Sequence, residues 1–217
     1  MMDLITSNLI WTQSPHLVIA LASFGLLGLL TWRPIFYVCL ILFAFSFYFF
    51  RNPERICPAA LHDRELIIAP ADGTIIDVAY DAKNSFEGYP HKLSIFLSPL
   101  DVHVMWTPIA GIVEKIQYVP GEFNCAFLPK SSLKNEHNDL LLKDTKGRYV
   151  LARQIAGIIA RRICCWVTPG NQLTQGHKYG MIKFGSRVDI FLPENVRIQV
   201  GIGQTVRGGS TIIARWT

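Results

Sequence analysis

The sequence predicts a mainly β protein, in which a barrel-like or sandwich-like β domain follows an N-terminal apolar helical hairpin. Hydrophobic residues make up 50% of the 217-residue chain and its mean hydropathy is +0.28, which is high for a soluble domain of this size. The excess is concentrated between residues 17 and 50. From Leu66 onward, short apolar and β-branched runs alternate with Gly, Pro, Asn and Asp, a pattern typical of strands joined by turns.

The hairpin consists of two apolar runs, residues 17–32 and 35–50, separated only by Arg33 and Pro34. Each run has 16 residues, fewer than the roughly 20 that an untilted helix needs to cross the hydrocarbon core. Pro34 lacks a backbone donor and Arg33 is costly at mid-bilayer, so a turn is predicted between the runs. Residues 1–55 are therefore expected to associate with the membrane, either as two short crossings or as a hairpin that dips into one leaflet.

Basic residues directly after the hairpin predict its orientation. Arg51, Arg55 and Arg64 follow the second run, and such residues tend to stay on the cytoplasmic side. The rest of the chain, residues 56–217, is therefore expected at the cytoplasmic face of the cell membrane. The net charge of +5 includes no dense Lys/Arg run, so anionic lipid headgroups are favoured over nucleic acid as partners. The five cysteines show no metal-binding spacing, and neither a metal site nor a disulfide framework is expected.

The β domain is expected to consist of short strands with one long irregular segment. Small turn residues separate apolar pairs in "TPIAGIVEKI" and "VGIGQTVRGGSTII", a rhythm typical of flattened, sandwich-like barrels. The segment 121–142 lacks strand character, and long irregular segments in compact domains are often functional. Strands are predicted within residues 65–80, 92–99, 102–121, 149–157, 161–170 and 187–214.

Four stretches of the β domain contain the candidate site residues. They are "APADGTI" with Asp72, "FLSPLDVHVMWTP" with His103, "NEHND" with His137, and "FGS" with Gly185 and Ser186. Each has an ordinary explanation when taken singly. Asp72 suits a turn, the histidines suit a half-buried strand and a solvated loop, and Gly185 suits a bulge beside a strand serine. Only the ordered set favours chemistry over these explanations.

In this order and spacing, the four stretches resemble the phosphatidylserine decarboxylase family, specifically its short form. The resemblance covers nearly the whole chain, including the apolar hairpin that ends in "FRNPER". It implies a proenzyme that cuts itself between Gly185 and Ser186. The fragments, residues 1–185 and 186–217, are expected to stay together as a heterodimer, and whether they assemble further is left open.

The resemblance also implies a covalent cofactor, a pyruvoyl group derived from Ser186. A serine hydroxyl can attack a polarised neighbouring carbonyl, here that of Gly185, and convert the peptide bond into an ester. Loss of the Ser186 Cα proton eliminates the ester to a dehydroalanine, which hydrolyses to the pyruvoyl group. A carbonyl at this position can accept the electrons released by decarboxylation, as other cofactors do. The implied reaction converts phosphatidylserine in the membrane to phosphatidylethanolamine and CO2.

The resemblance assigns roles to the remaining candidates and leaves one role open. Asp72 would orient a histidine during self-cleavage, in the manner of a triad, and His103 would act in decarboxylation. Asp101 is expected on the same strand face as His103, with a structural role. Long members of the family read "DYHxVH", whereas Trp106 stands at the second histidine position here. The base for self-cleavage is therefore either His103, serving both steps, or His137.

Two alternative functions are compatible with the sequence. The same reaction on a related aminophospholipid, such as archaetidylserine, is one, because the motifs relate to the headgroup and not to the lipid backbone. The other is a non-enzymatic, membrane-anchored barrel that serves as an interaction module. The mass of the purified protein separates the interaction module from the two decarboxylases, because only a self-cleaving enzyme yields two fragments.

Overall fold

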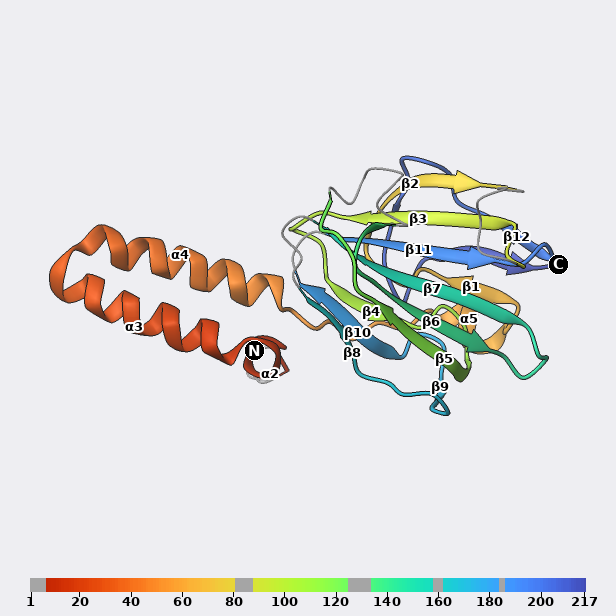
Figure 1. Ribbon diagram of the computed structural model, residues 1–217, viewed down its shortest axis with the longest axis horizontal. Helices are drawn as coiled ribbons and strands as arrows, with labels where there is room; N and C mark the ends of the chain where they lie inside the picture. Colours follow the sequence, from red (N-terminus) through yellow and green to blue (C-terminus); the bar gives the residue numbers. More distant parts are fainter. Residues whose placement is uncertain (1–6, 81–87, 125–133, 158–161, 184–185) are drawn as a thin grey trace. The chain divides into compact units, whose positions relative to one another are not determined.

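The computed structural model describes residues 7–80, 88–124, 134–157, 162–183 and 186–217 (Figure 1). The chain divides into two compact units, Met1–Glu54 and Arg55–Thr217. Strands account for 40% of the structure and helices for 23%. The predicted fold class, mainly β after an N-terminal helical part, is confirmed, although the sheets in the described ranges do not close into a barrel.

The first unit contains helices α2 (Ile10–Gln13), α3 (Pro15–Thr31) and α4 (Arg33–Phe49). The two long helices both have a proline in their first two positions, where its missing N–H costs no hydrogen bond. They lie side by side (Figure 1), and a Cβ atom on Gly28 would lie 2.6 Å from the backbone nitrogen of Phe36. The turn predicted at Arg33 and Pro34 is therefore matched by two closely packed helices. Among the described residues, no helix is both long enough and apolar enough to cross a membrane.

Three antiparallel sheets form the described part of the second unit. The largest has eight strands in the order β13-β2-β3-β11-β7-β6-β5-β9, and the two smaller sheets have the orders β1-β14-β12 and β4-β10-β8. A short helix, α5 (Pro58–His62), precedes them. The strands are β1 (Leu66–Ile68), β2 (Gly73–Ala79), β3 (His91–Leu97), β4 (Val104–Trp106), β5 (Gly111–Val119), β6 (His137–Lys143), β7 (Tyr149–Ala156), β8 (Arg162–Cys165), β9 (Gln172–Leu173), β10 (Lys178–Lys183), β11 (Ser186–Leu192), β12 (Val196–Ile198), β13 (Thr205–Val206) and β14 (Ile212–Trp216).

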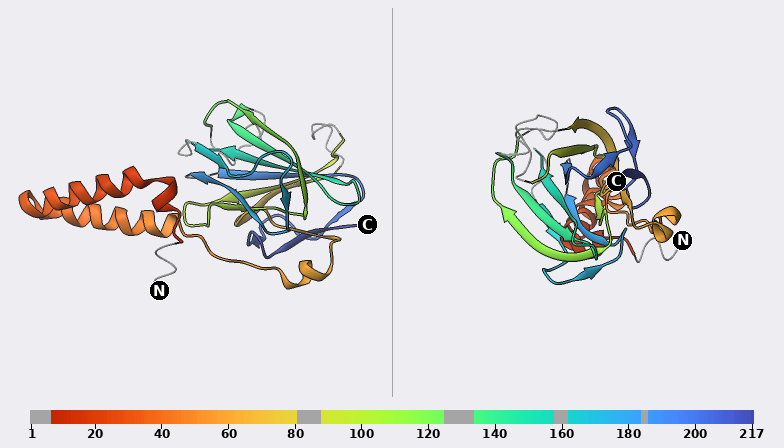
Figure 2. Two further views of the ribbon diagram at one scale, coloured as in Figure 1. Left: turned by 90° about the horizontal axis from the view of Figure 1, so that it is seen from below. Right: turned by 90° about the vertical axis from the view of Figure 1, so that its right-hand side faces the viewer.

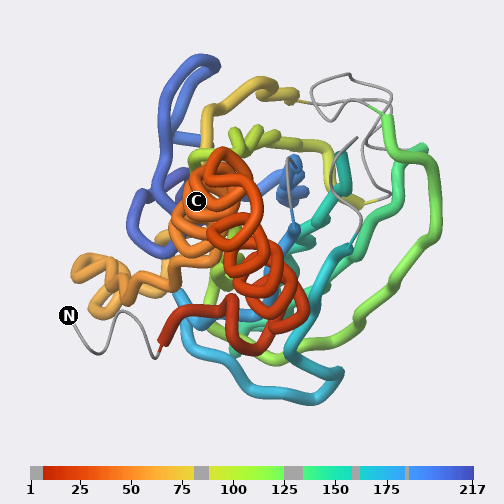
Figure 3. The backbone as a smooth tube through the Cα atoms, turned by 90° about the vertical axis from the view of Figure 1, so that its left-hand side faces the viewer, coloured from red at the N-terminus to blue at the C-terminus, as the bar shows by residue number. Residues whose placement is uncertain are grey.

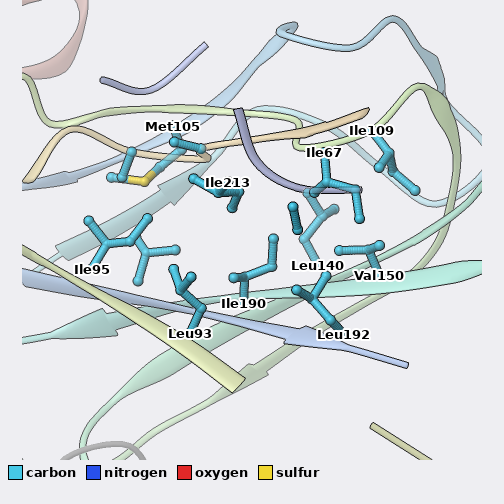
Figure 4. Packing of buried hydrophobic residues seen from close by; sticks show 14 of the residues in the cluster. Ile67, Leu93, Ile95, Met105, Ile109, Leu140, Val150, Ile190, Leu192 and Ile213 are labelled. Carbon is cyan, nitrogen blue, oxygen red and sulfur yellow. The ribbon is translucent and has the colours of Figure 1, made fainter. Parts of the chain in front are cut away.

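One apolar core joins the three sheets. Figure 4 shows side chains of the large sheet, such as Ile95 and Ile190, facing Ile67, Met105 and Ile213 of the smaller sheets, and all five are fully buried. The large sheet curves around this core (Figure 2). Next to the edge strand β9, β5 follows a curved path, with a register shift between Val113 and Lys115 (Figure 3). The smaller sheets therefore pack on one face of the large sheet, as in a sandwich, and the other face of the large sheet is turned away from this core.

The segment predicted to be irregular is partly a strand. β6 begins at His137 and pairs with both β5 and β7, so the expectation of irregular structure is wrong for residues 137–142. Leu140 and Leu142 point into the core, while Asp139 lies on the other face and binds Arg153 of β7. The local sequence did not predict this strand, because its polar residues interrupt the apolar pattern and their partners lie on a neighbouring strand.

Candidate active site

Asp72, His103 and Ser186 lie at one end of the eight-stranded sheet. β2 begins at Gly73 and β11 begins at Ser186, while β3, which runs antiparallel to both, ends at Leu97. Ser186 pairs directly with Leu97. Because neighbouring strands are about 4.8 Å apart, the backbone of Asp72 lies on the order of 10 Å from that of Ser186. The starts of β2 and β11 therefore set the positions of Asp72 and Ser186.

A short loop returns the chain from β3 to His103 at this same end. Ser98 N–H donates to the Asp101 carboxylate at 2.7 Å, and Asp101 N–H donates to the Ser98 carbonyl at 3.0 Å. The carbonyl of His103 then accepts a hydrogen bond from Ile182 N–H at 3.1 Å, four residues before Ser186. Asp101 therefore closes a loop, and the expectation that it lies on a strand with His103 is wrong.

The ring of His103 is fully buried and its tautomer follows from one contact. Nδ1 lies 3.0 Å from the carbonyl oxygen of Asp101, and because a carbonyl can only accept, Nδ1 carries the proton. In the neutral ring, Nε2 then carries the lone pair that a base needs. This arrangement prepares His103 to take up a proton.

The hydroxyl of Ser186 lies on the core face of the sheet. Ser186 is fully buried beside Ala156 and Leu97, and within the described ranges its Oγ has no hydrogen-bond partner. Buried polar groups without a partner are uncommon and need an explanation. A reactive role for the hydroxyl supplies one. Gly185, the other half of the predicted cleavage site, lies outside the described residues.

The strand register separates His137 from Ser186. His137 pairs with Ile155, which pairs with Arg187. Directly opposite residues project from the same face of a sheet, and neighbours along a strand project from opposite faces. His137 therefore projects with Arg187 from the outer face, whereas Ser186 projects with Ala156 into the core. The structure does not bring the two predicted side chains together.

Asp72 binds an arginine that sequence reasoning missed. The Arg55 guanidinium donates to both Asp72 carboxylate oxygens, at 2.9 Å for Nη2, and Gly208 N–H donates to the same carboxylate at 2.9 Å. Arg55 also lies over the Trp106 ring, 4.8 Å from its centroid. Among the described residues, no hydrogen bond joins Asp72 to a histidine. The position of the second histidine in long members is thus occupied by an indole stacked on a guanidinium.

Room for that indole depends on the loop before β14. A Cβ atom on Gly208 would lie 2.4 Å from the Trp106 ring, closer than side chains pack. The only sequence signal for Arg55 was its place in "FRNPER" just after the hairpin, since the separation of 17 positions between Arg55 and Asp72 matches no regular spacing. A contact between residues this far apart in the chain depends on the tertiary fold and cannot be predicted from local sequence.

Two positive charges lie side by side at the end of β10, the strand that leads to Ser186. Lys183 ends β10 and lies directly opposite Arg162 of β8. Burial lowers the pKa of the Lys183 ammonium below its ordinary value, the charge of Arg162 lowers it further, and Cys164 has the opposite effect. Two like charges side by side repel each other, so this pair is suited to attract an anionic group.

Comparison with known proteins identifies the family. A family model described as phosphatidylserine decarboxylase matches residues 42–214. A phosphatidylserine decarboxylase proenzyme from Desulfotalea psychrophila (strain LSv54 / DSM 12343) is 42% identical over 180 residues, which cover 82% of this chain and 83% of the relative. A protein of the same name from Amoebophilus asiaticus (strain 5a2) is 46% identical over 169 residues, which cover 77% of this chain and 74% of the relative. With the motifs placed as described, the chain belongs to the phosphatidylserine decarboxylase family.

Proposed function

We propose that this enzyme decarboxylates phosphatidylserine to phosphatidylethanolamine and CO2, with a pyruvoyl group that it makes by cutting its own chain between Gly185 and Ser186. The observation that carries the proposal is the buried Ser186 hydroxyl, which has no partner among the described residues and lies at the same sheet end as His103. The word proenzyme in the names of the relatives supports processing of the chain.

Self-cleavage begins with the transfer of a proton from Ser186 to a base. Nε2 of His103 carries the lone pair for this transfer, and the Ser186 oxygen then attacks the Gly185 carbonyl carbon. The C–N bond breaks as the C–O bond forms, so the amide becomes an ester. Removal of the Ser186 Cα proton expels the Gly185 carboxylate, and water then replaces nitrogen on the resulting dehydroalanine, which releases ammonia.

The residues around position 186 fit the pyruvoyl group that this sequence of steps leaves. When present, the group supplies a carbonyl that accepts the electrons released with CO2. His103 would hold or deliver a proton at the carbon that loses CO2, because its Nε2 carries a lone pair and its backbone is hydrogen bonded to the strand that leads to Ser186. The dry core face strengthens every charge interaction there. Asp72, paired with Arg55, is proposed as a positioning residue.

We further propose that the helical hairpin holds the enzyme at the cytoplasmic face of the cell membrane. Large apolar side chains on α3 and α4 are strongly exposed within their own unit, including Ile19 at 64%, Leu30 at 76% and Ile41 at 67%. Exposed apolar surface of this extent marks an interaction site. Lipid is the favoured partner because the substrate's acyl chains stay in the bilayer.

The fragments are proposed to remain together as a heterodimer. β11, at the start of the fragment 186–217, pairs along its length with β3 and β7 of the fragment 1–185. Separation would break both ladders and open the core.

Substitution of Ser186 tests the proposed function. Ser186→Ala removes the attacking hydroxyl, so the chain should keep its full mass and release no CO2 from phosphatidylserine vesicles. Ser186→Cys should cleave slowly and in part, because a thiol can make the same acyl shift through a thioester. Asp72→Asn should cleave more slowly than the parent chain, and the masses of the chain and its fragments over time measure this rate. Decarboxylation by Ser186→Ala would refute the pyruvoyl mechanism.

A further inference from the structure

A buried charged network lies on the outer face of the large sheet, directly behind Ser186. The next residue, Arg187, donates from Nε to one Asp189 oxygen at 2.5 Å and from Nη2 to the other at 3.0 Å. The same Nη2 donates to Ser94 Oγ of β3 at 2.9 Å. Arg187 is 1% exposed, and Asp189 and Ser94 are fully buried. These contacts join the first residues of β11 to a neighbouring strand through side chains.

The network continues across the sheet in the other direction. Asp189 lies directly opposite Arg153 of β7, and the Arg153 guanidinium donates to both oxygens of Asp139 on β6, at 2.7 Å each. Arg153 and Asp139 are also buried, at 5% and 6% exposure. Two arginines and two aspartates therefore alternate over three strands, with Ser94 fixing the network to a fourth.

Stability alone does not explain this network. The desolvation of buried ions offsets most of their mutual attraction, and well-packed apolar residues of similar size often serve as well or better. Arginine and carboxylate side chains pair through two parallel hydrogen bonds, which set both the distance and the relative orientation of the two groups. Apolar contacts do not set them in this way. The network is thus suited to hold β11 at one position along its neighbours.

We infer that Arg187, with Asp189 and Ser94, is a clamp that keeps position 186 in place after the chain is cut. This inference rests on the proposed self-cleavage. The cut turns position 186 into a chain end, and chain ends fray unless they are tied down. A reacting group must nevertheless stay within about 0.5 Å of its productive position. Arg187 ties down the adjacent residue from the outer face, so the clamp occupies none of the core face into which position 186 projects.

The clamp predicts that its loss affects the cut chain more than the intact chain. Arg187→Met removes the guanidinium and all of its hydrogen bonds. Ser94→Ala removes only the hydrogen bond to β3, and it leaves the Arg187–Asp189 ion pair and the residues of the cut site unchanged. Each substitution is made in the self-cleaving chain and in the Ser186→Ala chain, which stays intact. Hydrogen exchange of β11 amides is then measured by mass spectrometry on all four proteins and their two parents.

In the cut chain, both substitutions should speed exchange at the start of β11 by at least about tenfold more than in the intact chain. They should also lower kcat more than they raise KM, at unchanged pyruvoyl content per molecule. Arg148→Met is the matched control, because Arg148 is a half-buried arginine paired with Asp144 and Glu65 that has no described contact with β11. It should speed exchange equally in both chains and leave kcat unchanged.

Equal acceleration of exchange by Ser94→Ala in the cut and intact chains, with unchanged kcat, would overturn the clamp and leave an ordinary structural network. Failure of the proposed function is a separate result. In that case the parent chain with Ser186 would itself remain uncut, whatever residue stands at position 94 or 187.

Discussion

At the residue scale, the chemistry depends on which histidine the fold brings to Ser186. Both candidates bind a backbone carbonyl through Nδ1, His103 that of Asp101 and His137 that of Asn135, so their tautomers match. His137 projects from the outer face of the large sheet, away from Ser186, whereas the backbone of His103 is hydrogen bonded to the strand that leads to Ser186. Because Trp106 stands at the second histidine position, we expect His103 to serve both self-cleavage and decarboxylation.

His103→Ala should therefore leave most of the chain uncut and lower decarboxylation by about 100- to 10,000-fold, the usual contribution of general acid-base catalysis. Fragment masses report the first effect and CO2 release from phosphatidylserine vesicles the second. His137→Ala is the matched control and should cleave and turn over at rates close to those of the parent. A normal rate of both steps in His103→Ala would remove this residue from the site.

Residue identities were predictable to the extent that motifs carry them. The ordered stretches pointed to Asp72, His103 and Ser186, and the fold places all three at one sheet end. The partner of Asp72 was not predictable, because Arg55 approaches it from a segment with no periodic relation to β2. The separation of His137 from Ser186 depends on strand register, and a shift by one residue would reverse the face.

At the element scale, charged side chains join strands that the hydrophobic pattern alone would leave unconnected. Glu65 precedes β1 and binds Arg148 and Lys146 of the β6–β7 turn. Arg148 also stacks on Trp216 of β14, 4.2 Å from its centroid. The same effect explains why β6 was missed, since its polar residues are matched by Arg153 of β7. Alternation predicted most of the strands and failed at β6, where the consecutive polar residues Asn138 and Asp139 interrupt the apolar pattern.

The Glu65 cluster predicts a pH dependence of stability. Hydrogen bonds from Arg148 and then Lys146 lower the pKa of Glu65 from 4.5 to about 2. A carboxyl whose pKa is lower in the folded state contributes stability that is fully present above its unfolded pKa and is lost as the pH falls toward the folded value. The contribution of Glu65 should therefore be complete above about pH 4.5 and decline between about pH 4.5 and 2.

Urea unfolding of the intact Ser186→Ala chain can test this dependence. Glu65→Gln should lower the free energy of unfolding at pH 7, and the difference from the parent should shrink as the pH falls below 4.5. In an Arg148→Met background the same substitution should have a smaller and flatter effect, because the main cause of the shifted pKa is absent. A difference that does not change with pH would contradict the role given to the cluster.

At the scale of the whole molecule, the proposed function divides the work between two units, one for chemistry and one for contact with lipid. All the site residues described above belong to the unit Arg55–Thr217, which has its own core. The hairpin contributes exposed apolar helices and none of these residues. Composition predicts this division, because an apolar excess confined to one segment is visible without any knowledge of contacts.

Removal of residues 1–50 should leave a chain that folds and cuts itself, since Arg55 and the core are retained. Turnover of phosphatidylserine in vesicles should fall, because the enzyme no longer stays near its substrate, while turnover of a short-chain soluble analogue should persist. Steady-state rates on both substrates measure the difference. Equal losses on the two substrates would show that the hairpin is needed for the fold itself.

The central position of β11 has a consequence for how the molecule can be rebuilt. Before the cut, folding is a reaction within one chain, and its rate does not depend on protein concentration. After the proposed cut, β11 would belong to a different chain from β3 and β7, its neighbours on both sides. Recovery from denaturation then requires two chains to meet, and it slows in proportion to dilution while exposed strands compete by aggregating. With the proposed cut, the active enzyme would be assembled once, from the uncut chain, and would be difficult to regain from its separated fragments.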